Sequence, residues 1–148
     1  MKKWLFIFIA FCVAISIVYI FYFKTTTLKE ILPSMYENNI KSMRINEKFI
    51  GDEKQEEREV LIEDQEVIEK ILKDSSDMKL KDGDFHSEAQ TTSSFYFIRV
   101  VFDDTSKNFS FYMVDSGLMV KSDSYTVVEA NDLKQALNQE DVDWESVK

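Results

Sequence analysis

Hydrophobic side chains fill the first part of the chain without interruption, whereas they alternate with polar ones over most of the remainder. Residues Trp4–Phe23 carry no charge, and Cys12 and Ser16 are their only mildly polar members. A helix of twenty residues is about 30 Å long, which matches the hydrocarbon core of a bilayer. The pattern therefore predicts an N-terminal transmembrane anchor within residues 1–24.

Charges around this segment predict its orientation. Lys2 and Lys3 precede the apolar run, and acidic residues soon join the lysines after it. The positive-inside rule then favours a single-pass protein of the cell membrane, with a cytoplasmic N-terminus and an extracytoplasmic C-terminal domain. A cleaved signal peptide, which would release a secreted protein, is the main alternative, but the run ends in bulky residues that suit cleavage poorly. Lipidation of Cys12 is disfavoured because bulky Phe11 precedes it.

The segment after the anchor, residues 25–39, is expected to be a stem. Thr27 and Glu30 have the spacing of a capping box, so a short helical turn is predicted from Leu28. Pro33, the only proline, limits that turn.

Residues 40–140 are expected to form one domain. The clearest element is a helix over residues 65–73, capped by Asp64, in which Val67, Ile68, Ile71 and Leu72 form one apolar stripe. A second helix is predicted to end at Asn138, with Asn131 as its cap. The run 51–59 is interpreted as a charged turn or a solvated strand edge, and 85–94 as a loop. Strands are predicted at 40–49, 60–62, 77–81, 95–102, 109–114, 118–121 and 125–129.

Runs of strands flanked by separate helices indicate an α+β fold. We expect a curved antiparallel β-sheet packed by the amphipathic helix of residues 65–73, with a C-terminal helix and the transmembrane helix preceding them. Residues 141–148 form an acidic tail, which Trp144 is expected to dock.

Charge and cysteine content narrow the functional classes. The formal net charge is −9, and about −11 once Lys2 and Lys3 are left out. Such a chain lacks the clustered cations that nucleic-acid binding requires, so no nucleic-acid partner is expected. Cys12 is the only cysteine, which leaves residues 25–148 without a disulfide or a cysteine-based metal site.

Candidate catalytic and metal-binding residues are few. His86 is the only histidine and lies in a polar stretch, where an exposed residue is expected rather than a general base. Asp82 and Asp84 flank Gly83 as in a turn, and the residues after them lack the pattern of a calcium loop. Three glycines in the chain leave no loop that cradles phosphate. No catalytic residue, cofactor or metal site is therefore predicted.

Aromatic residues cluster in two of the predicted strands. Core packing explains most of them, and an exposed aromatic surface for a partner is the alternative. The candidate residues for such a partner surface are Tyr96, Tyr112 and Tyr125.

Three stretches carry a resemblance: the Lys2-Lys3 start, Glu63–Leu72 (EDQEVIEKIL) and Phe111–Val120 (FYMVDSGLMV). In these the chain is similar to small membrane-anchored or secreted proteins of Bacillus-type Gram-positive bacteria that carry domains of unknown function. The resemblance implies a surface location and no activity.

Three functions are compatible with these features. The leading hypothesis is a non-enzymatic, membrane-tethered extracytoplasmic binding or regulatory domain. One alternative is a toxin-immunity or inhibitor protein that neutralises a basic partner through charge complementarity. The other is a hydrolase that uses carboxylates which the sequence does not place.

Overall fold

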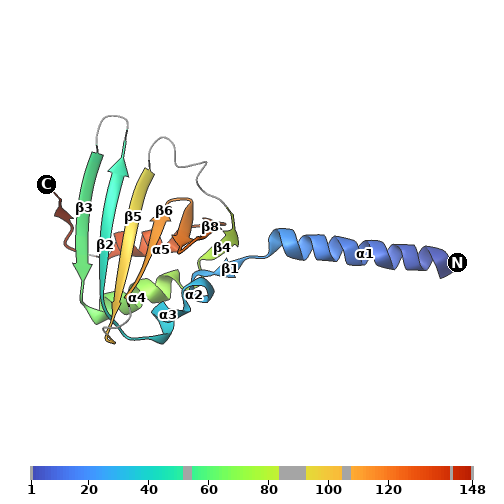
Figure 1. Cartoon of the computed structure of the whole chain (residues 1–148), viewed down its shortest axis with the longest axis horizontal. Helices are drawn as coiled ribbons and strands as arrows, with labels where there is room; N and C mark the ends of the chain where they lie inside the picture. Colours follow the sequence, from blue (N-terminus) through green and yellow to red (C-terminus); the bar gives the residue numbers. More distant parts are fainter. Residues whose placement is uncertain (1, 52–54, 84–92, 105–107, 141, 148) are drawn as a thin grey trace.

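The computed structural model describes residues 2–51, 55–83, 93–104, 108–140 and 142–147, and the statements below concern these residues. A long N-terminal helix projects from a domain in which helices pack against a large sheet (Figure 1). The elements are α1 (Lys2–Phe23), β1 (Thr26–Thr27), α2 (Leu28–Ile31), α3 (Pro33–Glu37), β2 (Ile40–Ile50), β3 (Gln55–Ile62), α4 (Gln65–Ser75), β4 (Lys79–Asp82), β5 (Ser93–Phe102), β6 (Asn108–Val114), β7 (Gly117–Val120), β8 (Asp123–Val127), α5 (Asp132–Gln139) and β9 (Glu145–Ser146).

The helix α1 leaves the domain beside β1 and β4, far from β3 and the C-terminus (Figure 1). Its large apolar side chains face outward wherever they are described; Trp4, for example, is 80% exposed and Phe8 65%. In the described part of the chain, no helix combines the length and the apolarity that a membrane crossing requires.

The described strands form one open sheet in the order β1-β4-β8-β7-β6-β5-β2-β3-β9. Each pair of neighbours is antiparallel. The aromatic and β-branched strand β5 lies between β2 and β6, as its composition predicts. The predicted α+β class with an antiparallel sheet is thus confirmed, and most predicted elements lie within two residues of the observed bounds.

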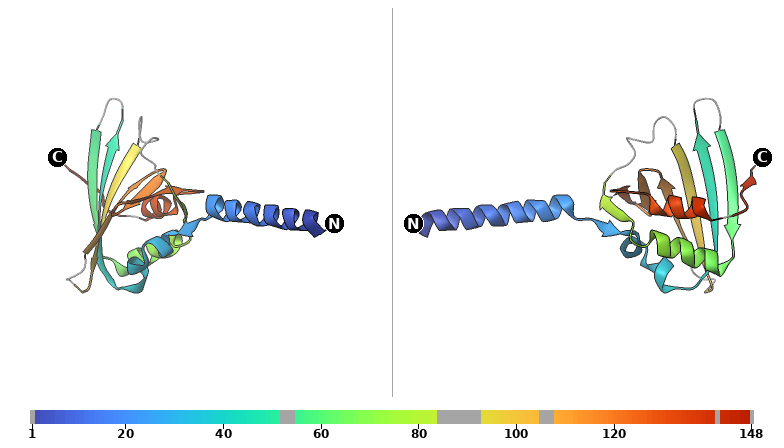
Figure 2. Two further views of the ribbon diagram at one scale, coloured as in Figure 1. Left: turned by 45° about the vertical axis from the view of Figure 1, so that its right-hand side comes forward. Right: turned by 180° about the vertical axis from the view of Figure 1, so that it is seen from behind.

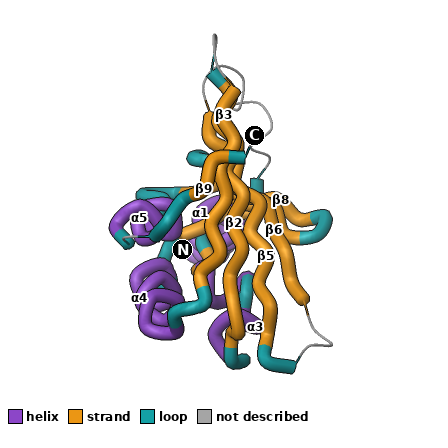
Figure 3. The backbone as a smooth tube through the Cα atoms, turned by 90° about the vertical axis from the view of Figure 1, so that its left-hand side faces the viewer, coloured by secondary structure: helices purple, strands orange, loops and turns teal. Residues whose placement is uncertain are grey.

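The helices α4 and α5 begin at the predicted caps. The Asp64 carboxylate accepts a hydrogen bond from the Glu66 amide at 2.9 Å, and the Asn131 side-chain oxygen accepts one from the Lys134 amide at 3.0 Å. Their apolar stripes are buried in one cluster with residues of the sheet. Figures 2 and 3 show the helices of the domain on one side of the sheet, so its two faces are covered unequally.

Residues 25–39 belong to the domain, which corrects the expected stem. The predicted capping box of Thr27 and Glu30 is present, and α2 begins at Leu28 as expected. Leu28, Leu32 and Met35 are each at most 1% exposed and join the core cluster. The Leu28 amide also donates to the carbonyl of Met78 at 3.0 Å. The segment is therefore held by buried apolar contacts and cannot serve as a free spacer.

The run 51–59 was predicted to be either a charged turn or a solvated strand edge, and its residues 55–59 are part of β3, which continues through the predicted strand 60–62. Its charged residues alternate between the faces of the sheet, and Arg58 lies opposite Glu47 of β2. The C-terminal segment is docked as expected, because β9 pairs with β3 and Trp144 packs partly buried against the core. Residues 84–92, with Asp84, His86 and most of the predicted loop, lie outside the described residues.

Candidate functional site

The sheet has one face without helices, and its side chains can be assigned from strand register. Successive residues of a strand point to opposite faces. On β5, Tyr96, Ile98 and Val100 point into the core and are at most 2% exposed, so Phe95, Phe97 and Arg99 point to the other face. We call this second surface over β2, β5 and β6 the open face.

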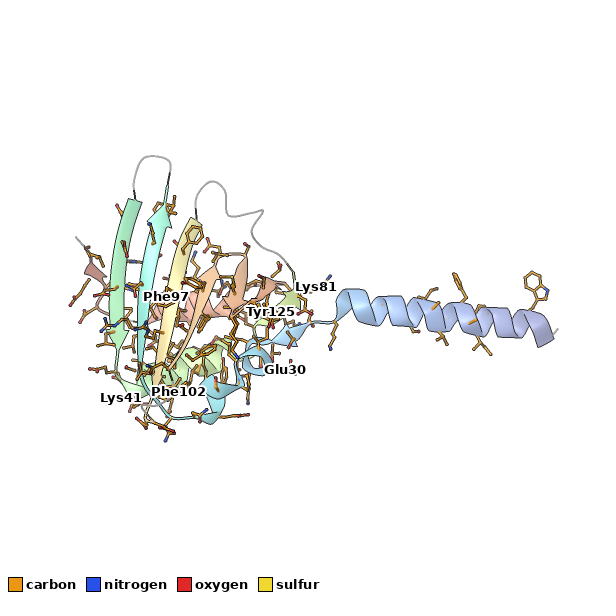
Figure 4. All side chains as sticks on the ribbon, in the orientation of Figure 1. Glu30, Lys41, Lys81, Phe97, Phe102 and Tyr125 are labelled. Carbon is orange, nitrogen blue, oxygen red and sulfur yellow. The ribbon has the colours of Figure 1, made fainter. Side chains whose placement is uncertain are left out.

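An aromatic pair lies in the middle of the open face. Phe97 of β5 is registered opposite Tyr112 of β6, and their ring centroids are 5.0 Å apart with the planes tilted by 43°. Tyr112 is 52% exposed, although most tyrosines of this domain are better covered. Figure 4 labels Phe97 on β5. This geometry is favourable for an aromatic pair and leaves ring surface available for contact.

A groove runs along these rings. Its volume is about 370 Å³, and its walls are mainly apolar and aromatic. Ile50 at the end of β2 is 39% exposed and extends the apolar surface. The lining residues are Asn46, Lys48, Ile50, Glu57, Phe95, Tyr96, Phe97 and Tyr112. A few polar groups beside an apolar floor are typical of a binding site.

Two arginines face each other beside the aromatic pair. Arg44 of β2 is registered directly opposite Arg99 of β5, and both are exposed. On the neighbouring strands, Leu61 of β3 lies opposite Arg44 and Ser110 of β6 lies opposite Arg99, so neither directly opposed residue supplies a carboxylate. Within the described residues neither arginine forms a salt bridge, although the Arg99 guanidinium carbon lies 5.9 Å from the centre of the Phe97 ring. Like charges in directly opposed positions destabilise a sheet.

The opposite face holds a buried ionic cluster. Glu47 of β2 is 6% exposed; one of its oxygens accepts a hydrogen bond from the Tyr96 hydroxyl at 2.8 Å, and the other pairs with Arg58 Nε. The Arg58 guanidinium carbon lies 4.4 Å from the centre of the Trp144 ring. Strand register brings the first three residues together, since Glu47 lies opposite both Arg58 and Tyr96.

The cluster controls the protonation of its members. Burial acts to raise the pKa of Glu47, but the hydrogen bonds from Arg58 and Tyr96 outweigh it and hold that pKa below its usual value. Burial, together with the hydrogen bond to the Glu47 carboxylate, raises the pKa of the Tyr96 phenol. Glu47 is therefore an ionised, satisfied carboxylate at neutral pH, which is the arrangement of a structural ion pair.

A second cavity, of about 710 Å³, adjoins this cluster at the edge of the sheet. Its lining residues are Glu47, Phe49, Glu56, Glu57, Arg58, Ser146 and Val147. Because Arg58 neutralises Glu47, the remaining charge around the cavity is negative.

The described residues contain no group of three or more histidine, cysteine, aspartate or glutamate side chains placed to hold a metal ion. Asp82 ends β4, where it lies opposite Tyr125 of β8. His86 and Asp84 lie in a segment that the structure leaves undescribed.

The three tyrosines predicted to form a partner surface do not lie together. Tyr96 is 2% exposed and belongs to the buried cluster, because it points to the core face of β5. Tyr112 lies on the open face. Tyr125 lies opposite Leu118 and packs half-buried against the core; Figure 4 labels it near β4, on the side where α1 leaves. Tyr112 alone of the three is on the open face.

A search among protein-family models, curated proteins and solved structures found no match to this chain. The candidate site therefore depends on the geometry of this chain alone.

Sequence reasoning did not single out Glu47, Arg58, Arg44 or Arg99. A signal was present for Arg99 alone, because it interrupts the apolar run of β5 and alternation places it on the same face as Phe95 and Phe97. Strand alternation placed these three residues on one face, but the partner strand and its register were needed to find Arg44.

Proposed function

We propose that this protein is a non-enzymatic domain, tethered to the cell membrane and extracytoplasmic, that binds a partner protein through the open face of its sheet. The observation that carries the proposal is the pair of half-buried Phe97 and exposed Tyr112 beside a groove on the side of the central strands without helices.

The apolar side chains that the open face leaves partly in water support a binding role. An aromatic side chain contributes stability when it is removed from water, at about 25 cal/mol per Å² of apolar area. Phe95 and Phe97 are half-buried and Ile50 is 39% exposed, so these side chains leave part of that contribution unused while facing a groove. Aromatic residues are enriched at protein interfaces, where a partner covers them.

The tether is supported by the sequence of α1 and by the outward direction of its described side chains. The uncharged run Trp4–Phe23 has the length of a bilayer core, and Phe8 and Phe11 are more than 60% exposed. Lys2 and Lys3 favour a cytoplasmic N-terminus. The resemblance to anchored surface proteins of Gram-positive bacteria supports the same compartment. With α1 in lipid, the membrane lies beside β1 and β4, away from the open face over β2, β5 and β6.

The ionic cluster favours binding over catalysis. A general acid or base works best with a pKa near the operating pH. Glu47, the buried carboxylate, has its pKa shifted the other way and has both oxygens engaged. This arrangement supports a structural role and weakens the hydrolase alternative.

Photo-crosslinking in cells that express the full-length protein tests the proposed surface. We expect benzoylphenylalanine in place of Tyr112 to form a discrete adduct, because its ring occupies the centre of the open face. The control position is Glu69, which is exposed on α4. Adding Phe97→Ser should weaken the adduct at position 112. An absence of adducts at 112, or equal adducts at 69, would contradict the proposal.

An inhibitor that neutralises a basic protein is the second candidate. It is favoured by the net charge of −9 and by the negative rim of the 710 Å³ cavity. The two candidates use different surfaces, so the same experiment separates them. An adduct from position Glu56, combined with none from Tyr112, would support the inhibitor.

A further inference from the structure

The charge of the open face differs from that of the rest of the domain. Residues after Lys24 are strongly acidic in total, yet the open face holds an arginine pair beside its central aromatic pair. Of the carboxylates that β3 places on this face, Glu57 is registered opposite Lys48, and Glu59 accepts a hydrogen bond from the Asn46 amide at 3.2 Å. Within the described residues neither carboxylate forms a salt bridge with Arg44 or Arg99. This part of the open face therefore carries three cations, Arg44, Lys48 and Arg99, against two carboxylates, and the arginine pair lies next to the aromatic pair.

Because Arg44 and Arg99 lie directly opposite each other, their like charges slightly destabilise the unbound domain. Cross-strand neighbours have Cβ atoms about 5 Å apart, and like charges at that distance repel. A negatively charged group placed between the guanidinium groups would remove the repulsion and accept charge-assisted hydrogen bonds from both. The repulsion in the unbound protein thus favours an anionic ligand.

The spacing of Arg99 and Phe97 along β5 indicates where a second side chain of the ligand would lie. Arg99 and Phe97 are two residues apart on one strand, which is about 6.6 Å. An extended peptide has the same interval between every second side chain, so a carboxylate at the arginine pair would place the side chain two residues on above Phe97 and Tyr112.

We infer that the open face binds an extended acidic segment of a partner protein, in which a carboxylate side chain and an aromatic or large apolar side chain are two residues apart. The carboxylate binds between Arg44 and Arg99, and the apolar side chain enters the groove beside Phe97 and Tyr112. This inference rests on the proposed function, since it names the partner chemistry of the same surface.

The test uses the full-length protein in nanodiscs of zwitterionic lipid and short dye-labelled peptides. One peptide has glutamates two residues from a central phenylalanine with threonines between them; a second has glutamines in place of the glutamates. We expect fluorescence anisotropy to show binding of the glutamate peptide and about tenfold weaker binding of the glutamine peptide. Added salt should weaken only the first.

Variants locate the interaction. The double variant Arg44→Gln/Arg99→Gln should bind the glutamate peptide about tenfold more weakly, at the level of the glutamine peptide. The matched control Lys29→Gln/Lys73→Gln removes two exposed cations elsewhere and should bind like the wild type. Unfolding curves should show the arginine variant at least as stable as the wild type, which separates lost binding from lost folding.

Three results would overturn the inference. Equal affinity for both peptides, lost on Phe97→Ser, would refute the acidic partner while leaving the binding face in place. An absence of binding to either peptide would refute the partner chemistry, and crosslinking from position 112 would then decide the proposed function separately. Arginine-dependent binding to vesicles of phosphatidylglycerol, without peptide binding, would assign the face to anionic lipid instead.

Discussion

The variant Leu28→Ala is expected to be less stable than the wild type by about 3 kcal/mol. Leu28 is 0% exposed and lies in the core cluster, although only a few residues separate it from α1. Removing its side chain leaves a cavity that the surrounding sheet and helices fill only partly, so both transfer free energy and packing are lost. Urea unfolding of the full-length protein in detergent, followed by circular dichroism, measures the difference.

The neighbouring residue provides the control for this prediction. Lys29 is exposed on the same helix, and Lys29→Ala should change the free energy of unfolding by less than about 0.5 kcal/mol. If both variants unfolded at the same urea concentration as the wild type, residues 25–39 would be a spacer outside the domain.

The variant Arg58→Gln is expected to lose about 2 kcal/mol of stability at neutral pH. It leaves the Glu47 carboxylate buried without its cation, while Tyr96 still donates its hydrogen bond. The loss is smaller than for a fully buried pair because the Arg58 side chain is 45% exposed and water screens it. The control is Arg44→Gln, an arginine of the adjacent strand that forms no salt bridge within the described residues and should not destabilise the sheet.

The stability difference between the wild type and Arg58→Gln should depend on pH in a defined direction. The pKa of Glu47 is lower in the folded wild type than in the unfolded chain, so its contribution is complete above the unfolded pKa of about 4.3 and is lost as pH falls through the folded value. Without Arg58 the pKa of Glu47 rises, because burial then faces fewer opposing hydrogen bonds. The stability difference between the proteins should therefore be largest near pH 7 and shrink toward pH 3. A difference independent of pH would mean that Arg58 acts through packing alone.

Local patterns were sufficient to predict most of the elements and the fold class. The caps Thr27, Asp64 and Asn131 and the apolar stripe of α4 depend on residues a few positions apart, so they are visible in the sequence. The sequence left open whether the charged run was a turn or a strand edge, because its strand character depends on pairing with β2. The burial of Leu28 was missed for a similar reason, since its neighbours in space come from distant segments.

Of the candidate site, the sequence predicted only that its strands are rich in aromatic residues. The aromatic richness of β5 and β6 indicated either a core or an exposed surface, and the structure divides the residues between the two according to their alternation. Which face the helices cover is a tertiary property, so Tyr96 and Tyr112 could not be separated beforehand. The arginine pair and the Glu47 cluster likewise depend on the register of three strands.

Maleimide labelling of single cysteines tests most directly whether the open face is a binding surface. In a Cys12→Ser background, Tyr112→Cys, Phe111→Cys and Glu69→Cys place a thiol on the open face, in the core and on α4. For the purified protein we predict rapid labelling at positions 112 and 69 and labelling at 111 only on unfolding. In native membranes we predict slower labelling at 112, because a partner covers it, with no change at 69. Slow labelling at 112 in the purified protein, or no protection there in the membrane, would contradict the account.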